Sequence, residues 1–93
     1  SGPAYYFAFT EALIKAGESM GLSSKQASDL AIDTFLGTAA LIKENRSPEV
    51  LRERVTSKGG TTAAALSILM KNNCLDNLVK DALVAAEKRS KEL

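Results

Sequence analysis

The most constraining feature of this sequence is a long predicted helix whose second half is apolar on every side. The helix begins after Ser23 or Ser24, either of which can cap its first turn, and continues to about Asn45. Residues 35–42 read Phe-Leu-Gly-Thr-Ala-Ala-Leu-Ile, and a helix of this kind has to be surrounded by other apolar surface. Because a chain of 93 residues can bury only a modest core, we expect a second subunit to supply part of that surround.

The rest of the sequence also carries helix signals, and no segment alternates apolar and polar residues for long enough to predict a strand. Both prolines stand where a helix is expected to begin, a position that tolerates the missing N–H group. We therefore predict an all-α fold of about five helices in a single domain that spans residues 1–93. The other four helices are expected at about residues 3–20, 48–56, 61–71 and 75–90, with Gly21 ending the first and Asn72 and Asn73 separating the last two.

Composition argues against several classes of protein. Twelve basic and eleven acidic side chains leave a net charge of +1, which does not suggest a nucleic-acid partner. The apolar stretch at residues 35–42 is far shorter than the roughly 20 residues of a membrane span, so no membrane partner is expected. The chain has no histidine, the commonest metal ligand, and we expect no metal site. Its single cysteine, Cys74, fits a reducing cytosol, so a cytoplasmic location is expected.

Residues 56–62, which read Thr-Ser-Lys-Gly-Gly-Thr-Thr, form the one segment where chemistry is expected. Gly59 and Gly60 place no side chain in the way of a ligand that approaches the backbone. The helix that follows leaves its first N–H groups without internal acceptors, and its dipole adds partial positive charge at the same place. The segment therefore suits a carboxylate or a phosphate, and the hydroxyls of Thr61 and Thr62 can add hydrogen bonds.

The same pattern has a simpler interpretation, which is a turn between two helices with a threonine N-cap. From the pattern alone this interpretation is favoured, because capping threonines after glycines are common. The segment lacks the Gly-Lys-Ser/Thr order of a phosphate loop, and no strand precedes Gly59 as a dinucleotide fingerprint requires. We therefore expect no cofactor-binding residue in this chain. Cys74 is better explained as a structural residue, because no histidine is present to activate it.

Three stretches and the tail of the sequence carry further motifs. Residues 1–5 read Ser-Gly-Pro-Ala-Tyr, residues 20–22 read Met-Gly-Leu, residues 55–63 read Val-Thr-Ser-Lys-Gly-Gly-Thr-Thr-Ala, and the tail covers residues 84–93. Each resembles the matching segment in the C-terminal domain of pyrroline-5-carboxylate reductases, whose signature in the third stretch is Val-Thr-Ser-Pro-Gly-Gly-Thr-Thr-Ala. Lys58 stands where that signature has proline, which loosens the loop and adds a charge near the expected site.

This resemblance implies the dimerisation and substrate-binding domain of an oxidoreductase that converts L-1-pyrroline-5-carboxylate to L-proline, the last step of proline biosynthesis. The implied fold is an intertwined helical homodimer, similar to the C-terminal domain of 6-phosphogluconate dehydrogenase, and dimers in this family often assemble into decamers. An N-terminal Rossmann domain, absent from this chain, would bind NADPH or NADH. The missing initiator methionine agrees with a longer parent protein, and we expect the chain alone to be inactive.

The resemblance also implies roles for residues of the glycine-rich segment. The substrate-binding residues would be Ser57, Gly59, Gly60, Thr61 and Thr62, with the substrate carboxylate held by the backbone N–H groups of the last three. Thr62 would be the catalytic residue, because its hydroxyl would face the ring nitrogen of the substrate. With these implied roles, a substrate-binding segment is favoured over a simple turn between two helices.

Two other functions stay open at this point. The first is a stand-alone, non-catalytic helical dimerisation module, in which Gly59 and Gly60 only form a turn. The second is the helical domain of a different dehydrogenase with a similar two-domain plan, in which the glycine-rich segment is a coincidence. A Rossmann domain encoded immediately upstream in the parent gene would favour the reductase over the module.

Overall fold

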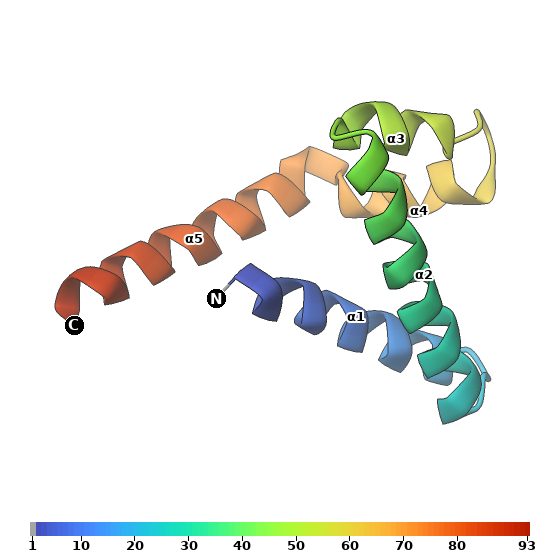
Figure 1. Ribbon diagram of the computed structural model, residues 1–93, viewed down its shortest axis with the longest axis horizontal. Coiled ribbons are helices and arrows are strands. Elements are labelled where there is room, and N and C mark those ends of the chain that lie inside the picture. Colours follow the sequence, from blue (N-terminus) through green and yellow to red (C-terminus); the bar gives the residue numbers. More distant parts are fainter. Residues whose placement is uncertain (1) are drawn as a thin grey trace. The chain divides into compact units, whose positions relative to one another are not determined.

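A computed structural model describes residues 2–93 and confirms the all-α fold. Along the chain follow α1 (Gly2–Ser19), α2 (Ser24–Glu44), α3 (Pro48–Arg54), α4 (Thr61–Leu69), the short 3-10 helix η1 (Lys71–Asn73) and α5 (Cys74–Glu92) (Figure 1). The five predicted helices are all present among these residues, and each end lies within two residues of the predicted one. Ser1, the first residue of the opening motif, lies outside the described residues. None of the helices in residues 2–93 has the length and apolar character that crossing a membrane requires.

The chain divides into two compact units, one that ends at Leu51 and one that begins at Arg52. The first unit contains α1 and α2, and the second contains α4, η1 and α5. That residues 1–93 act as one domain stays a prediction.

The connection between α1 and α2 is fixed by local hydrogen bonds. Gly21 adopts a φ of 105°, which a residue with a side chain rarely does, and the N–H of Leu22 donates to the carbonyl of Gly17 (3.1 Å). The side chain of Ser23 then accepts from the N–H of Gln26 (3.1 Å), and the Gln26 side chain accepts from the N–H of Ser23 (3.0 Å). This reciprocal capping box makes Ser23 the N-cap of α2.

Helices α1 and α2 pack against each other through small residues. A Cβ atom added at Gly17 would lie 3.2 Å from the Cβ of Ala27, so the two backbones approach closely at this point. Ala27 is 3% exposed and Ala31 is 8% exposed. Further along the same two helices, the ring centroid of Phe35 lies 6.2 Å from that of Tyr6. The packing therefore joins α1 and α2 through a very narrow interface.

The buried core is even smaller than the modest core that the sequence led us to expect. In the part of the chain that the structure describes, Ala27 and Ala31 are the only buried apolar residues. Large apolar side chains of the apolar half of α2 are exposed, and Leu36 reaches 64%. Units of two or three helices have little interior, so they cannot cover apolar surface on every side of a helix. This exposure favours the second subunit that the sequence predicts.

The junction between α4 and α5 is a sharp break in the backbone, as the two asparagines predict. Asn72 and Asn73 have φ values of 54° and 56°, in the left-handed region that asparagine tolerates better than most residues. The thiol of Cys74, which follows, donates to the carbonyl of Leu69 (2.9 Å). Carbonyl groups at the end of a helix lack internal donors, so this contact supports a structural role for Cys74.

Candidate functional site

The glycine-rich segment folds into a tight turn that leads directly into α4. The N–H of Gly60 donates to the carbonyl of Ser57 (3.0 Å), which closes a four-residue turn over Lys58 and Gly59. Gly59, the third residue of the turn, has a φ of 74°, whereas the φ of Lys58 is not positive. This combination is typical of a type II turn, which requires glycine or asparagine at its third position. The turn itself therefore accounts for the glycine at position 59.

Gly60 is the N-cap of α4, so the threonine N-cap of the simpler interpretation is wrong. Gly60 has extended backbone angles (φ −86°, ψ −178°), and its carbonyl accepts the first helical hydrogen bond from the N–H of Ala64 (3.1 Å). The reason is that the turn ends at Gly60, which moves the start of the helix one residue earlier than a threonine cap would. Thr61 and Thr62 are consequently the first two residues of the helix, and no side chain caps this end.

Close packing explains why a glycine occupies position 60. A Cβ atom added there would lie 2.6 Å from the side-chain oxygen of Ser57 and 3.2 Å from the Ser57 carbonyl oxygen. The first distance is shorter than real Cβ contacts, and the second leaves the backbone little room to adjust. A side chain at this position would therefore require the Ser57 hydroxyl to rotate away and the turn to shift by a few tenths of an ångström.

The hydroxyl groups of Thr61 and Thr62 differ from those of Thr10 and Thr34, two other helical threonines in the chain. Thr10 and Thr34 each donate to the carbonyl four residues earlier, at 2.8 Å and 2.7 Å. Thr61 and Thr62 are in the first turn of α4, where no carbonyl of that helix lies four residues before them. Both residues are exposed, so their hydroxyls can hydrogen-bond to a ligand.

The structure brings the five predicted substrate-binding residues together, in one turn and the helix start that follows it. Ser57, Gly59 and Gly60 form the turn, and Thr61 and Thr62 open the helix. That these residues bind a substrate, and that Thr62 is catalytic, stay predictions. Among residues 2–93, no three His, Cys, Asp or Glu side chains gather closely enough to hold a metal ion.

Thr56 helps to position the turn, a role that the sequence analysis missed. Its hydroxyl donates to the carbonyl of Arg52 at 2.6 Å, which ties the start of the turn to the last residues of α3. The signal was present in the sequence, because a threonine four residues after a helical residue can form this bond even where the helix ends.

Comparison with known proteins identifies a family that the whole sequence matches. The whole sequence, residues 1–93, matches the family described as pyrroline-5-carboxylate reductase dimerisation. The chain belongs to this family. It is 46% identical over 94 residues to the pyrroline-5-carboxylate reductase of Pseudomonas aeruginosa, and equally so to that of Arabidopsis thaliana. Both alignments cover 100% of this chain and 34% of the relative, so the chain spans about a third of the length of the curated relatives it matches.

A solved structure agrees with the family match. The crystal structure of Plasmodium falciparum pyrroline carboxylate reductase with NADP bound superimposes with a TM-score of 0.88 at 37% identity. The match covers 98% of this chain and 36% of that chain. Membership of the pyrroline-5-carboxylate reductase dimerisation family decides against the helical domain of a different dehydrogenase.

Lys58 occupies the second position of the turn, where proline is favoured because its ring pre-sets the φ angle that a type II turn needs. In residues 2–93 no backbone acceptor pairs with the Lys58 N–H, so proline would lose no hydrogen bond there. We expect Lys58→Pro to stabilise the folded protein by about 0.4–1 kcal/mol, chiefly by restricting the unfolded chain. Urea unfolding at matched protein concentration checks this. Lys58→Ala is the control, because it removes the charge without fixing φ; equal or lower stability for Lys58→Pro would contradict the assigned turn.

Proposed function

We propose that this chain is the C-terminal part of a pyrroline-5-carboxylate reductase, which reduces L-1-pyrroline-5-carboxylate to L-proline with NADPH or NADH in the last step of proline biosynthesis. In this proposal the chain supplies the dimer interface and the site for the substrate carboxylate. The observation that carries it is the start of α4, where Gly60 lacks a capping side chain and two exposed threonines follow. Helix α2, in contrast, has its first turn capped by Ser23.

The carboxylate is assigned to the backbone N–H groups of Thr61 and Thr62. Both stand in the first turn of α4, before the first N–H that has a helical acceptor, and the helix dipole favours an anion there by about 0.3–1 kcal/mol. The N–H of Gly60 donates to the Ser57 carbonyl, which is why we assign the carboxylate to the two N–H groups that follow it. Gly59 and Gly60 contribute by leaving the approach free of side chains, and Ser57 lies against Gly60.

Thr62 is the residue to which we assign the catalytic role. Its backbone N–H and its hydroxyl belong to one residue, so a carboxylate bound at the helix start leaves the rest of a small substrate within reach of the hydroxyl. A hydroxyl can accept or donate a hydrogen bond, which suits a ring nitrogen whose protonation changes when the ring is reduced. The role of Thr62 is therefore to orient the ring and to support charge at its nitrogen.

The nucleotide is assigned to a part of the reductase outside these 93 residues. Residues 2–93 form helices only, and so they lack the strand, turn and helix in which the pyrophosphate of a dinucleotide binds. The curated relatives are about three times as long as this chain, which leaves room for such a domain.

We also propose that the reductase is a cytoplasmic homodimer. Exposed apolar side chains on α1, α2 and α5 support the dimer, as does the family description, which names dimerisation. The single cysteine, with no partner for a disulfide in this sequence, supports a reducing compartment.

The test compares the full-length protein that contains this chain with the 93-residue chain by itself. The full-length protein is expected to oxidise NADPH or NADH when L-1-pyrroline-5-carboxylate is added. The chain alone is expected to show no reductase activity and no nucleotide binding in calorimetry, because a helical domain without a dinucleotide fold cannot hold the cofactor.

Two results would contradict parts of this proposal. Micromolar nucleotide binding by the chain alone would contradict the division of the active site. A full-length protein that forms dimers but never reduces the substrate would overturn the enzymatic assignment in favour of a non-catalytic dimerisation module.

A further inference from the structure

Lys58 places a single positive charge in the turn that precedes α4. No other charged residue occurs between Arg54 and Lys71, a stretch that includes the turn and the whole of α4. The side chain of Lys58 is exposed, and the first turn of α4 contains no acidic residue. In the part of the chain that the structure describes, the ion pairs lie within α2 and at the end of α5, so none of them involves Lys58. No acidic side chain of this segment therefore offsets the charge of Lys58.

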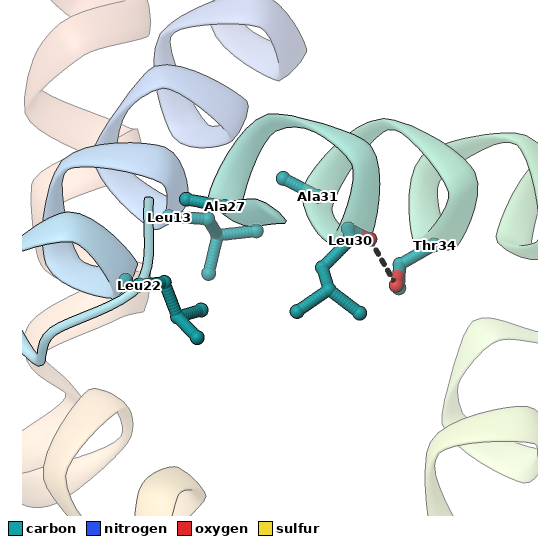
Figure 2. A pocket seen from close by; sticks show the side chains of 7 residues that line it. Leu13, Leu22, Ala27, Leu30, Ala31 and Thr34 are labelled. Atoms are coloured by element: carbon teal, nitrogen blue, oxygen red, sulfur yellow. Dashed lines mark hydrogen bonds between the residues drawn. The ribbon is translucent and has the colours of Figure 1, made fainter. Parts of the chain in front are cut away.

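The groove between α1 and α2 differs from this turn in its chemistry. It has a volume of about 270 Å³, and apolar side chains make up most of its lining. Figure 2 shows one polar side chain among those labelled, Thr34, whose hydroxyl donates to the carbonyl of Leu30 at 2.7 Å. This groove offers no charge to a ligand, whereas the turn before α4 offers a cation beside two exposed threonines.

The turn holds the backbone of Lys58 close to the start of α4. The N–H of Gly60 donates to the carbonyl of Ser57 at 3.0 Å, which closes the turn around Lys58. Three residues of backbone, from Lys58 to Thr61, span at most about 11 Å, and the four-carbon stem of a lysine reaches about 6 Å. The Debye length is about 10 Å at an ionic strength of 0.1 M. The ammonium group can therefore come within a Debye length of a carboxylate bound at Thr61 and Thr62.

We propose that Lys58 attracts the carboxylate of the substrate to the start of α4 and so sets how efficiently the reductase captures it. The inference rests on the proposed substrate site and adds a residue that tunes it. The N–H groups of Thr61 and Thr62 hold the carboxylate, and the flexible, strongly hydrated ammonium acts through its charge. The carboxylate keeps its charge while the ring is reduced, so the attraction is the same before and in the transition state. Lys58 should therefore affect KM rather than kcat.

The choice of lysine at this position exchanges rigidity of the turn for charge. Proline, which the family signature has here, would pre-set φ at the second position of the turn. Lysine leaves the turn freer in the unfolded chain and adds the cation. Lys58→Pro is therefore expected to stabilise the fold and, at the same time, to weaken substrate capture. These opposite effects separate the charge of Lys58 from its place in the turn.

The test is Lys58→Gln in the full-length reductase, assayed with L-1-pyrroline-5-carboxylate at saturating nucleotide and at ionic strengths from about 0.01 to 0.5 M. At the lowest ionic strength we expect kcat/KM to fall by about two- to fivefold, the effect of one exposed charge at this range. Salt should remove the difference, because the Debye length falls from about 30 Å at 0.01 M to about 3 Å at 1 M. Lys58→Arg keeps the charge and is expected to keep the wild-type kcat/KM.

Two further variants serve as controls. Lys71→Gln removes the same charge from an exposed lysine beyond the other end of α4, which has 9 residues and is about 14 Å long. We expect this variant to keep the wild-type kcat/KM and its salt dependence. Lys58→Pro should lower kcat/KM as much as Lys58→Gln does, although it makes the turn more rigid.

The results distinguish this inference from the proposed function. An active reductase whose kcat/KM is unchanged by Lys58→Gln at low ionic strength would overturn the role of Lys58 and leave the proposed function intact. A loss that persists at 0.5 M, or that is absent in Lys58→Pro, would also overturn it, because the shape of the turn rather than its charge would then be responsible. A full-length protein that does not reduce the substrate would overturn the proposed function and this inference together.

Discussion

Replacing Thr62 by alanine in the full-length reductase is expected to lower kcat/KM by roughly ten- to a hundredfold, because one hydrogen bond to the substrate nitrogen is worth about 1–3 kcal/mol in the transition state. The loss should fall mainly on kcat. The backbone N–H groups of Thr61 and Thr62 remain after the substitution, so the site for the substrate carboxylate stays in place. Steady-state kinetics with varied L-1-pyrroline-5-carboxylate at saturating nucleotide give both parameters.

Two variants control for effects on folding. Thr62→Ser keeps the hydroxyl and is expected to retain most of the activity. Thr61→Ala removes the neighbouring hydroxyl, and because Gly60 is the N-cap, it is not expected to cost the roughly 1 kcal/mol that loss of a threonine cap would. If Thr62→Ala kept full activity and only melted earlier, its role would be structural and the assignment of the catalytic residue would fail.

The position of the candidate site could be predicted from the sequence because its residues are contiguous. Two glycines followed by two threonines before an apolar helical pattern locate a helix start without any tertiary information. What the sequence could not supply was the hydrogen bond from the Gly60 N–H to the Ser57 carbonyl. That bond selects the turn type, makes Gly60 the N-cap and removes its N–H from the set of free donors, and none of these follows from residue types alone.

The helices were predictable for a similar reason, and their packing was not. Helix periodicity, the prolines at helix starts and the breaks at Gly21, Asn72 and Asn73 are local signals, and they gave the helix ends closely. Periodicity also shows that α5 has an apolar face, but it does not say which surface covers that face. The close contact between Gly17 and Ala27 depends on how α1 and α2 meet, and it has no signature in either helix alone.

The second large effect is expected in the thermal stability of the 93-residue chain, which should rise with protein concentration. Only Ala27 and Ala31 are buried in the part of the chain that the structure describes, so most of the stabilising burial has to come from association. When folding and dimerisation are coupled, a hundredfold increase in concentration stabilises the dimer by about 2.7 kcal/mol. For two chains of 93 residues this corresponds to a rise in Tm of about 5–10 °C.

Thermal melts followed by circular dichroism at about 1 and 100 µM measure the shift, and sedimentation equilibrium at the same concentrations reports the oligomeric state. Far-ultraviolet dichroism is the suitable signal because the described residues are almost entirely helical, so loss of the dimer and loss of helix should coincide in one transition. A Tm that is the same at both concentrations, together with a stable monomer at micromolar concentration, would show that the exposed apolar faces of α2 and α5 do not depend on a second subunit.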